Sequence, residues 1–112
     1  MADSIDIQRT GPEGATVVLR GEHDAYTAGR LDPELSALLA EGRSILVDLR
    51  NATFLDSATV AALLNASQEA EQLGLGLRLL LGGSTGHSVR RLLELTRLYE
   101  LVPTSEDVTP PG

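Results

Sequence analysis

The sequence predicts an α/β domain with a mixed, mostly parallel sheet of four or five strands and helices packed against it. Two short apolar segments, residues 44–49 and 77–81, have the length and residue types of buried strands. Each is followed by a segment in which apolar residues recur at three- and four-residue spacing, as in an amphipathic helix. Strands joined through helices form right-handed crossovers, which make the later strands parallel.

The first elements are expected to be a hairpin and a helix. Turn residues 11–14 separate a short segment, residues 5–9, from residues 15–21, which are rich in β-branched side chains. We expect the first helix to start at Asp32 as its N-cap, with Pro33 in its first position. Four leucines near this start then share one helical face.

The later elements follow from the same patterns. The strand at residues 44–49 should be central, and a second helix should start at Ser57, behind Asp56 as its cap. A third helix, capped by Ser88, should follow the strand at residues 77–81. The domain is thus expected to span residues 1–102. Its last ten residues, 103–112, carry three prolines and two acids, which predicts an exposed tail that is poorly ordered beyond its start.

Composition restricts the function classes. The chain has 112 residues, enough for one domain, and its 9 basic and 16 acidic residues give a net charge of −7. No basic stripe is present, so nucleic-acid binding is disfavoured and a basic protein partner fits better. The chain has no cysteine, and its two histidines, His23 and His87, have no local ligand spacing. We therefore expect no metal site and no cofactor.

The sequence also predicts where the protein works. The first residues lack the charged and apolar regions of a secretory signal, and no run of 18 apolar residues occurs. We therefore expect a cytoplasmic protein without membrane insertion. The sequence leaves self-association open.

Polar side chains gather at one predicted strand-to-helix turn. Asp56, Ser57 and Thr59 stand at the start of the second helix, where free N–H groups and the helix dipole favour a negative group such as a phosphate. Asp24 follows the second strand and could reach the same edge of the sheet. The structural alternative is that Asp56 only caps the helix.

A glycine-rich loop, Gly82 to Gly86, suggests a competing nucleotide-binding enzyme with aspartates as acid and base. The loop follows a strand and precedes a helix, but it lacks the lysine of a P-loop and the spacing of a dinucleotide fingerprint. No activated nucleophile or base accompanies the aspartates. A simple connection between strand and helix is therefore the better interpretation of this loop.

These motifs, in this order, resemble the STAS domain, the fold of bacterial anti-sigma factor antagonists, over residues 5–102. Residues 21–27 are similar to the family's Gly-Glu-x-Asp-x-x-Thr segment, and residues 47–49 to its central strand. Residues 54–57 resemble the start of its phosphorylation motif, and residues 89–95 its last main helix.

The resemblance implies partner switching. In that mechanism the unmodified antagonist binds an anti-sigma factor that is also a serine kinase, and phosphorylation of the antagonist ends the binding. The family motif reads Asp-Ser-Ser/Thr-Gly, with its third residue as the acceptor; here that position is Ala58 and the glycine position is Thr59. The glycine common after the last main helix is replaced by Arg97.

The alanine leaves three outcomes open. Ser57 or Thr59 substitutes as the acceptor, with Ser57 preferred; or the protein is an antagonist that cannot be switched off; or it is a STAS subunit of a signalling or lipid-transport assembly. We expect a non-enzymatic binding module that docks on an anti-sigma factor of the serine-kinase type. The predicted docking residues are Asp24, Asp56, Ser57, Ala58 and Thr59.

Overall fold

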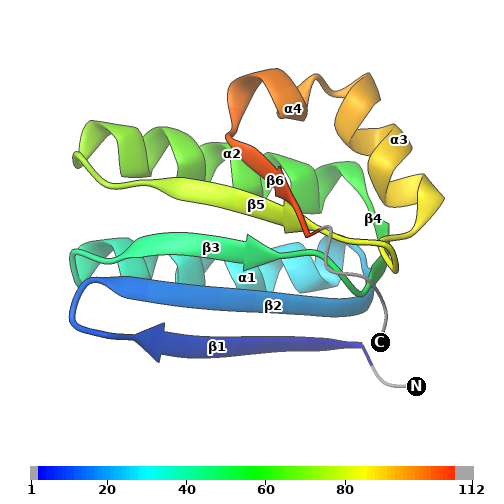
Figure 1. Ribbon diagram of the computed structural model, residues 1–112. Helices are drawn as coiled ribbons and strands as arrows, with labels where there is room; N and C mark the ends of the chain where they lie inside the picture. The colour runs from blue at the N-terminus through cyan, green and yellow to red at the C-terminus, as the bar shows by residue number, and fades with distance from the viewer. Residues whose placement is uncertain (1–2, 108–112) are drawn as a thin grey trace.

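The computed structural model describes residues 3–107, and within them a single sheet is packed against helices (Figure 1). The strands are β1 (Ser4–Thr10), β2 (Gly14–His23), β3 (Ser44–Asp48), β4 (Ala52–Leu55), β5 (Leu77–Leu81) and β6 (Thr104–Glu106). The helices are α1 (Ala25–Ala40), α2 (Ser57–Gln72), α3 (His87–Leu95) and α4 (Leu98–Leu101). The predicted α/β class is confirmed.

The sheet has the order β1-β2-β3-β5-β6, and β4 pairs with β2. β1 runs antiparallel to β2, as the predicted hairpin requires, and the remaining pairs are parallel. β3 is the central strand, as predicted, with Val47 opposite Val17 on one side and Leu79 on the other. The carboxyl ends of the parallel strands therefore meet at one edge, which is where loops carry functional residues in such sheets.

One face of the sheet is covered by α1 and α2, which lie side by side behind it in Figure 1. Alternate residues of the strands point to this face and form the core with the helices, because side chains in a strand alternate between the two faces. The core strands contribute Val17, Leu19, Ile45, Val47, Leu49, Leu79 and Leu81, all nearly or fully buried. The other face carries polar residues, among them Arg20 and Arg78.

The first helix starts earlier than the sequence predicted. α1 begins at Ala25 with Asp24 as its N-cap, so the expected start at Asp32 is wrong and Pro33 lies inside the helix. A proline cannot donate to the carbonyl four residues before it, which here is that of Gly29. Both residues are exposed, so water can bond this carbonyl, and the helix continues through the proline.

Three short elements were not predicted. β4 brings the sheet to six strands instead of four or five, and α4 follows α3 directly. β6, within the predicted tail, pairs with β5 over Thr104–Glu106, while residues 108–112 lie outside the described part of the chain. The predicted cap of the third helix is also wrong: Gly86 is the N-cap of α3, and the Ser88 hydroxyl donates instead to the Thr53 carbonyl at 2.9 Å.

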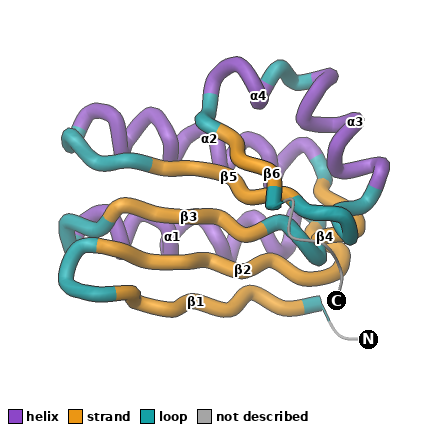
Figure 2. The backbone as a smooth tube through the Cα atoms, viewed as in Figure 1, coloured by secondary structure: helices purple, strands orange, loops and turns teal. Residues whose placement is uncertain are grey.

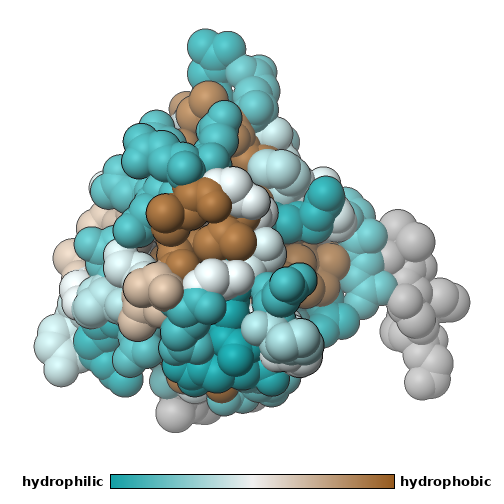
Figure 3. All heavy atoms as spheres, turned by 90° about the vertical axis from the view of Figure 1, so that its left-hand side faces the viewer, coloured by the Kyte–Doolittle hydropathy of each residue, from teal (hydrophilic) through white to brown (hydrophobic). Residues whose placement is uncertain are grey.

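The two ends of the sheet differ in character. Figure 2 shows the loops after β3 and β5 at the carboxyl end, close to β4. Figure 3 looks onto the opposite end and shows a group of hydrophobic side chains there. That end carries an apolar groove between the first residues of β3 and β5, lined in part by Ile45, Leu46 and Leu77. The predicted docking residues all lie toward the carboxyl end, away from this groove.

Candidate functional site

The turn between β4 and α2 is held by Asp56. Its backbone is extended, with φ −97° and ψ 176°, and its carboxylate oxygen Oδ1 accepts the Thr59 N–H at 3.0 Å. This bond satisfies one of the N–H groups left free at a helix start. Asp56 is half-buried and Ser57 is exposed, so the first turn of α2 reaches solvent. The structural role of Asp56 as a cap is confirmed.

Thr59 lies in the interior, although the sequence placed it among the solvent-facing candidates. Its side chain is fully buried, and its hydroxyl lies 3.2 Å from the carbonyl oxygen of His23, 3.3 Å from that of Asp24 and 3.2 Å from Oδ1 of Asp56. The hydroxyl thus ties α2 to the end of β2. In this fold Ser57, and not Thr59, presents its hydroxyl to solvent.

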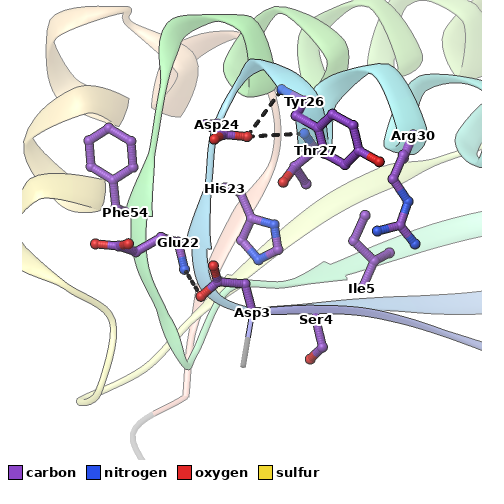
Figure 4. Close-up of a pocket in the computed structure, with 10 residues that line it drawn as sticks. All are labelled: Asp3, Ser4, Ile5, Glu22, His23, Asp24, Tyr26, Thr27, Arg30 and Phe54. Carbon is purple, nitrogen blue, oxygen red and sulfur yellow. Dashed lines mark hydrogen bonds between the residues drawn. The ribbon is translucent and has the colours of Figure 1, made fainter. Parts of the chain in front are cut away.

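The starts of α1 and α2 are joined through the end of β2. Asp24 caps α1 by accepting the N–H groups of Tyr26 at 3.1 Å and Thr27 at 3.2 Å, as Figure 4 shows. The Asp56 N–H donates to the His23 carbonyl at 3.0 Å, which fixes the two caps relative to each other. The predicted juxtaposition of Asp24 with Asp56 at one edge is therefore observed, and both helix starts point toward the same side.

Ala58 stands at the position of the family's acceptor, beside a shallow groove between α1 and α2. The groove has a volume of about 350 Å³ and is lined mostly by small residues: Ala28, Gly29, Asp32, Pro33, Ala58, Ala61, Ala62 and Asn65. Ala58 itself is half-buried, and its methyl group carries no polar atom. The surface at this position is therefore apolar, and only the neighbouring Ser57 offers a hydroxyl.

Two exposed aromatic side chains flank the joined helix starts, and the sequence reasoning missed both as surface residues. Tyr26, in the first turn of α1, is 78% exposed, and Phe54, in β4, is 41% exposed. Phe54 lies at the surface, whereas Leu55, its neighbour in β4, is buried. The chain has only three aromatic residues, so two of the three lie at this edge.

The glycine-rich loop is filled by the protein's own contacts. The buried Thr85 hydroxyl donates to the Leu49 carbonyl at 2.9 Å and accepts the Gly82 N–H at 3.0 Å. The N–H groups of Thr85 and Gly86 donate to carbonyls of Gly82 and Ala52. Three of the five N–H groups in the loop are thus already bonded, whereas a phosphate cradle requires them free.

A charged network connects Asp107, the last described residue, to the region of this loop. Arg50 donates to both oxygens of Asp48, at 3.0 Å and 2.8 Å, and to Asp107 at 2.8 Å. Burial raises the pKa of the Asp48 carboxyl, but the hydrogen bonds from Arg50 outweigh burial and hold that pKa below its ordinary value. Arg90 pairs with Glu106 and donates to the Gly82 carbonyl, which ties α3 to β6.

Arg97, which replaces the glycine common after the family's last main helix, has a left-handed backbone. Arg97 has φ 59° and ψ 24°, and within the described chain it is the one non-glycine residue with positive φ. Glycine adopts this left-handed backbone without strain, whereas a residue with a Cβ does not. Arg97 pairs with Glu100 at 2.7 Å, but both side chains are largely exposed.

Residues 3–107 offer neither a cluster of metal ligands nor a membrane-spanning helix. They contain no group of three histidine, cysteine or acidic side chains placed to hold a metal ion. No helix in this part of the chain is both long enough and apolar enough to cross a membrane.

Comparison with protein families identifies the fold. The model of the family described as "Mlab, STAS domain" matches residues 7–103, most of the chain. The chain belongs to the STAS domain family. None of the curated proteins matches it. The predicted family is thus confirmed over nearly the range that the sequence motifs gave.

Solved structures of STAS proteins have the same fold. The chain is similar to an anti-sigma factor antagonist from Mycobacterium paratuberculosis, with 21% identity, a TM-score of 0.76 and coverage of 96% of this chain and 88% of that one. It is also similar to a putative anti-sigma factor antagonist from Thermotoga maritima, with 17% identity, a TM-score of 0.76 and coverage of 93% of this chain and 86% of that one. SpoIIAA of Bacillus in its phosphorylated form has 18% identity and a TM-score of 0.74, and the match covers 94% of this chain and 92% of that one. At these identities the likeness establishes the fold.

Proposed function

We propose that this STAS domain is a non-enzymatic docking protein that binds an anti-sigma factor of the serine-kinase type. The docking face consists of the two helix starts at Asp24 and Asp56, the surface residues Ser57 and Ala58, and the aromatic flanks. The observation that carries the proposal is the exposure of Tyr26 and Phe54 on either side of the joined helix starts. Aromatic side chains are enriched among the residues that dominate binding energy at protein interfaces.

The charge of the face supports a basic partner surface. Glu22 and Asp24 are exposed beside it, Asp56 is half-buried, and the whole chain carries a net charge of −7. Complementary charge raises the rate of encounter more than it raises the affinity, so binding should become slower at high salt. The predicted anti-sigma factor would therefore present arginines or lysines to this face.

Regulation by phosphorylation depends on Ser57 in this proposal. Ala58 has no hydroxyl, Thr59 is buried, and Ser57 is exposed at the positive end of α2. A phosphate on Ser57 would be tolerated by the helix dipole but repelled by Asp56, so it would change the docking face while the fold stays intact. The negative charge would then weaken binding to a partner that fits the unmodified face.

Ala58 also supports a second candidate, a STAS subunit of a signalling or lipid-transport assembly. A methyl group at the acceptor position keeps the face permanently in the unmodified state, which suits a constitutive subunit. Such a subunit would use the same docking face without a switch. A nucleotide-binding enzyme gains no support, because three of the five N–H groups of the glycine-rich loop already donate to groups within the protein.

The test combines binding and modification. We expect calorimetry to give saturable binding between the chain and the serine-kinase anti-sigma factor of its own cell, and no binding of ATP by the chain alone. Incubation with that kinase and ATP should place phosphate on Ser57. Ser57→Asp should weaken the complex, while Ser84→Asp, the same change at an exposed serine in another loop, should not.

Four results would count against parts of the proposal. One is the absence of any complex with the kinase while a transporter or signalling subunit is recovered from the native cell, which favours the second candidate. Another is phosphate found only at residues other than Ser57, which removes the assignment of the acceptor. A complex in which the kinase, supplied with ATP, leaves the chain unphosphorylated would remove the switch and identify a constitutive antagonist. Saturable ATP binding by the isolated chain would reopen the enzyme hypothesis.

A further inference from the structure

The outer edge of β1 is unpaired in the described part of the chain. β1 ends the strand order β1-β2-β3-β5-β6 and lies lowest in Figure 1, where it pairs with β2. An antiparallel strand uses alternate residues for its two sides, so every second residue of β1 directs its N–H and carbonyl groups away from β2. These groups form a template on which another strand can pair.

Proteins usually protect such an edge, and β1 lacks the common protections. It has seven residues, contains no proline and pairs with β2 without a bulge. The opposite edge of the sheet, β6, has only three residues. Of the two charged residues of β1, Asp6 has its carboxylate 3.8 Å from the Arg20 guanidinium. The other, Arg9, pairs with Glu41. The edge is therefore long, and its charges are already matched within the chain.

The sequence of β1 is complementary to a second, antiparallel copy of itself. All seven residues are paired when Ile7 lies opposite Ile7 of the second copy. Asp6 then lies opposite Gln8, whose amide can donate to a carboxylate. Because alternate residues face outward, the next possible registers differ by two residues. One of these places Asp6 opposite Asp6, which is destabilising, and the other leaves the start of β1 unpaired.

The side of β1 that faces α1 adds an apolar surface and two opposite charges. Ile5 and Ile7 are half-buried, and with Arg30 and Glu34 of α1 they line a hollow of about 280 Å³. Figure 4 shows the Arg30 side chain beside Ile5. Arg30 and Glu34 are exposed, and neither takes part in an ion pair within residues 3–107. Both charges are therefore available to another chain.

A twofold axis through Ile7 brings these opposite charges together. α1 runs in the same direction as β1 in Figure 1, so it runs antiparallel to α1 of a second copy related by that axis. Arg30 and Glu34 are four residues apart on α1 and exchange places across the axis. Arg30 of each copy then faces Glu34 of the other, as a self-complementary interface requires. The two hollows beside Ile5 and Ile7 meet at the same axis.

The charge balance of this edge also favours a second copy as the partner. The charged residues of β1 and of the hollow are Asp6, Arg9, Arg30 and Glu34, whose charges cancel. The whole chain carries a net charge of −7, so two copies repel each other least where the surface is neutral. The contact consists of one strand and a few side chains from each copy, which places it among the small and weak interfaces.

We propose that the chain forms a weak, reversible dimer in which two β1 strands pair antiparallel around Ile7, so that one sheet runs through both copies. The docking faces lie at the carboxyl ends of the parallel strands and point in opposite directions in this dimer. One dimer can therefore bind two partner molecules at the same time.

Sedimentation equilibrium of the full chain, from about 10 µM to about 1 mM, tests the proposal. We expect the average mass to rise with concentration from that of one chain toward that of two. The measurement uses the chain alone, so its outcome is independent of the proposed function.

A charge exchange on α1 tests the contact across the axis. Arg30→Glu places a carboxylate opposite Glu34 twice in each dimer and should weaken dimerisation about tenfold. Arg91→Glu, at an exposed arginine on α3, makes the same change in net charge and should not. The double variant Arg30→Glu with Glu34→Arg restores both the opposite charges and the net charge, so it should dimerise like the native chain.

Two changes at the exposed Gln8 test the register of the strands. Gln8→Lys places a positive charge opposite Asp6 and should strengthen the dimer, whereas Gln8→Glu should weaken it, each by about fivefold. The same two changes at Gln68, exposed on α2, are the controls for net charge and should have smaller effects. As the dimer forms, amide hydrogen exchange should slow at every second residue of β1.

Three results would overturn the proposal. One is a chain that stays monomeric up to about 1 mM. Another is a dimer that Arg30→Glu and Arg91→Glu weaken equally, since net charge alone then explains the loss. The third is hydrogen exchange that slows with concentration at the docking face and stays constant in β1, which would place the contact between copies at the docking face.

Discussion

Replacing Arg50 by methionine tests whether the network at the carboxyl edge is held by one arginine. The Asp48 side chain is 7% exposed and keeps only the backbone N–H of residue 50, at 3.0 Å, once the guanidinium is gone. Methionine retains an aliphatic stem against Gly82, where the arginine stem lies now. The substitution therefore isolates the loss of charge and hydrogen bonds from the loss of packing.

The magnitude follows from the burial of the two partners. Leaving a buried charge without its partner costs about 3–5 kcal/mol, but Arg50 is 43% exposed and its attraction is partly screened by water. We therefore expect the free energy of unfolding to fall by about 1.5–3 kcal/mol at pH 7. Urea denaturation of the two proteins measures this difference. A double variant with Asp48→Asn should recover most of it, because no unpaired carboxylate remains.

The pH dependence of the stability difference between the native chain and Arg50→Met tests this reasoning. In the native chain the pKa of Asp48 is lowered by Arg50, so the stability it contributes is present above the unfolded pKa and is lost as pH falls through the folded pKa. Without the guanidinium, burial still raises that pKa, and only the backbone N–H of residue 50 and the charge of Arg20 oppose it, so protonation in acid relieves the variant more than the native chain. The difference between native chain and variant should shrink below about pH 4. A loss below 0.5 kcal/mol, or one independent of pH, would refute the reasoning.

Three further predictions concern other parts of the fold. Asp56→Ala removes the cap of α2 and should lower the free energy of unfolding by about 1–2 kcal/mol in urea denaturation, whereas no change would contradict its role as a cap. Arg97→Gly removes the strain of a left-handed backbone at a residue with a Cβ and loses only a weak, exposed ion pair with Glu100. The melting temperature should therefore rise by about 2–6 °C. A lower melting temperature would show that the ion pair contributes more stability than the strain costs. Hydrogen bonds from Arg9 and Arg43 lower the pKa of Glu41 to about 2, so the stability this group contributes is present above its unfolded pKa of 4.5 and is lost as pH falls to about 2. The free energies of unfolding of the native chain and Glu41→Gln should therefore differ at pH 6 and converge near pH 2. A difference that stays constant with pH would contradict this prediction.

The sequence predicted the elements whose patterns are long or purely apolar. β3, β5 and α2 lie where the apolar segments and the helical spacing placed them, because the core-facing residues of the two strands, such as Ile45, Val47 and Leu79, are all apolar. β4 and β6 have only four and three residues, and their pairing depends on strands far away in the chain. No local pattern of that length distinguishes a strand from a loop.

The start of α1 shows how a strong local signal misleads. Asp32 followed by proline is a typical helix start, yet Asp24 caps the helix and the chain passes through the proline. The residues between the two aspartates include Tyr26 and Gly29, both exposed, so they carry little apolar periodicity. The contacts of α1 with α2 and the sheet determine where the helix starts, and no local stretch of sequence contains those contacts.

At the candidate site the sequence predicted the position of the site in the fold better than the burial of its side chains. Asp24 and Asp56 share one edge because parallel strands bring their carboxyl ends together. The burial of Thr59 depends on carbonyls of residues 23 and 24, which are 36 and 35 positions away in the chain. The outward direction of Phe54 depends on which side of β4 faces the core, and a strand of four residues does not reveal this locally.

The most direct test of the docking face measures how tightly alanine variants of its two aromatic residues bind the partner. Tyr26→Ala and Phe54→Ala should each weaken binding to the anti-sigma factor by about 30-fold, the loss typical of a dominant interface residue. Leu95→Ala, at a hydrophobic residue on α3 whose exposure of 69% lies between those of Phe54 and Tyr26, is the matched control and should leave the affinity unchanged. If both aromatic variants bind as tightly as the native chain, or the control loses as much as they do, the docking face lies elsewhere.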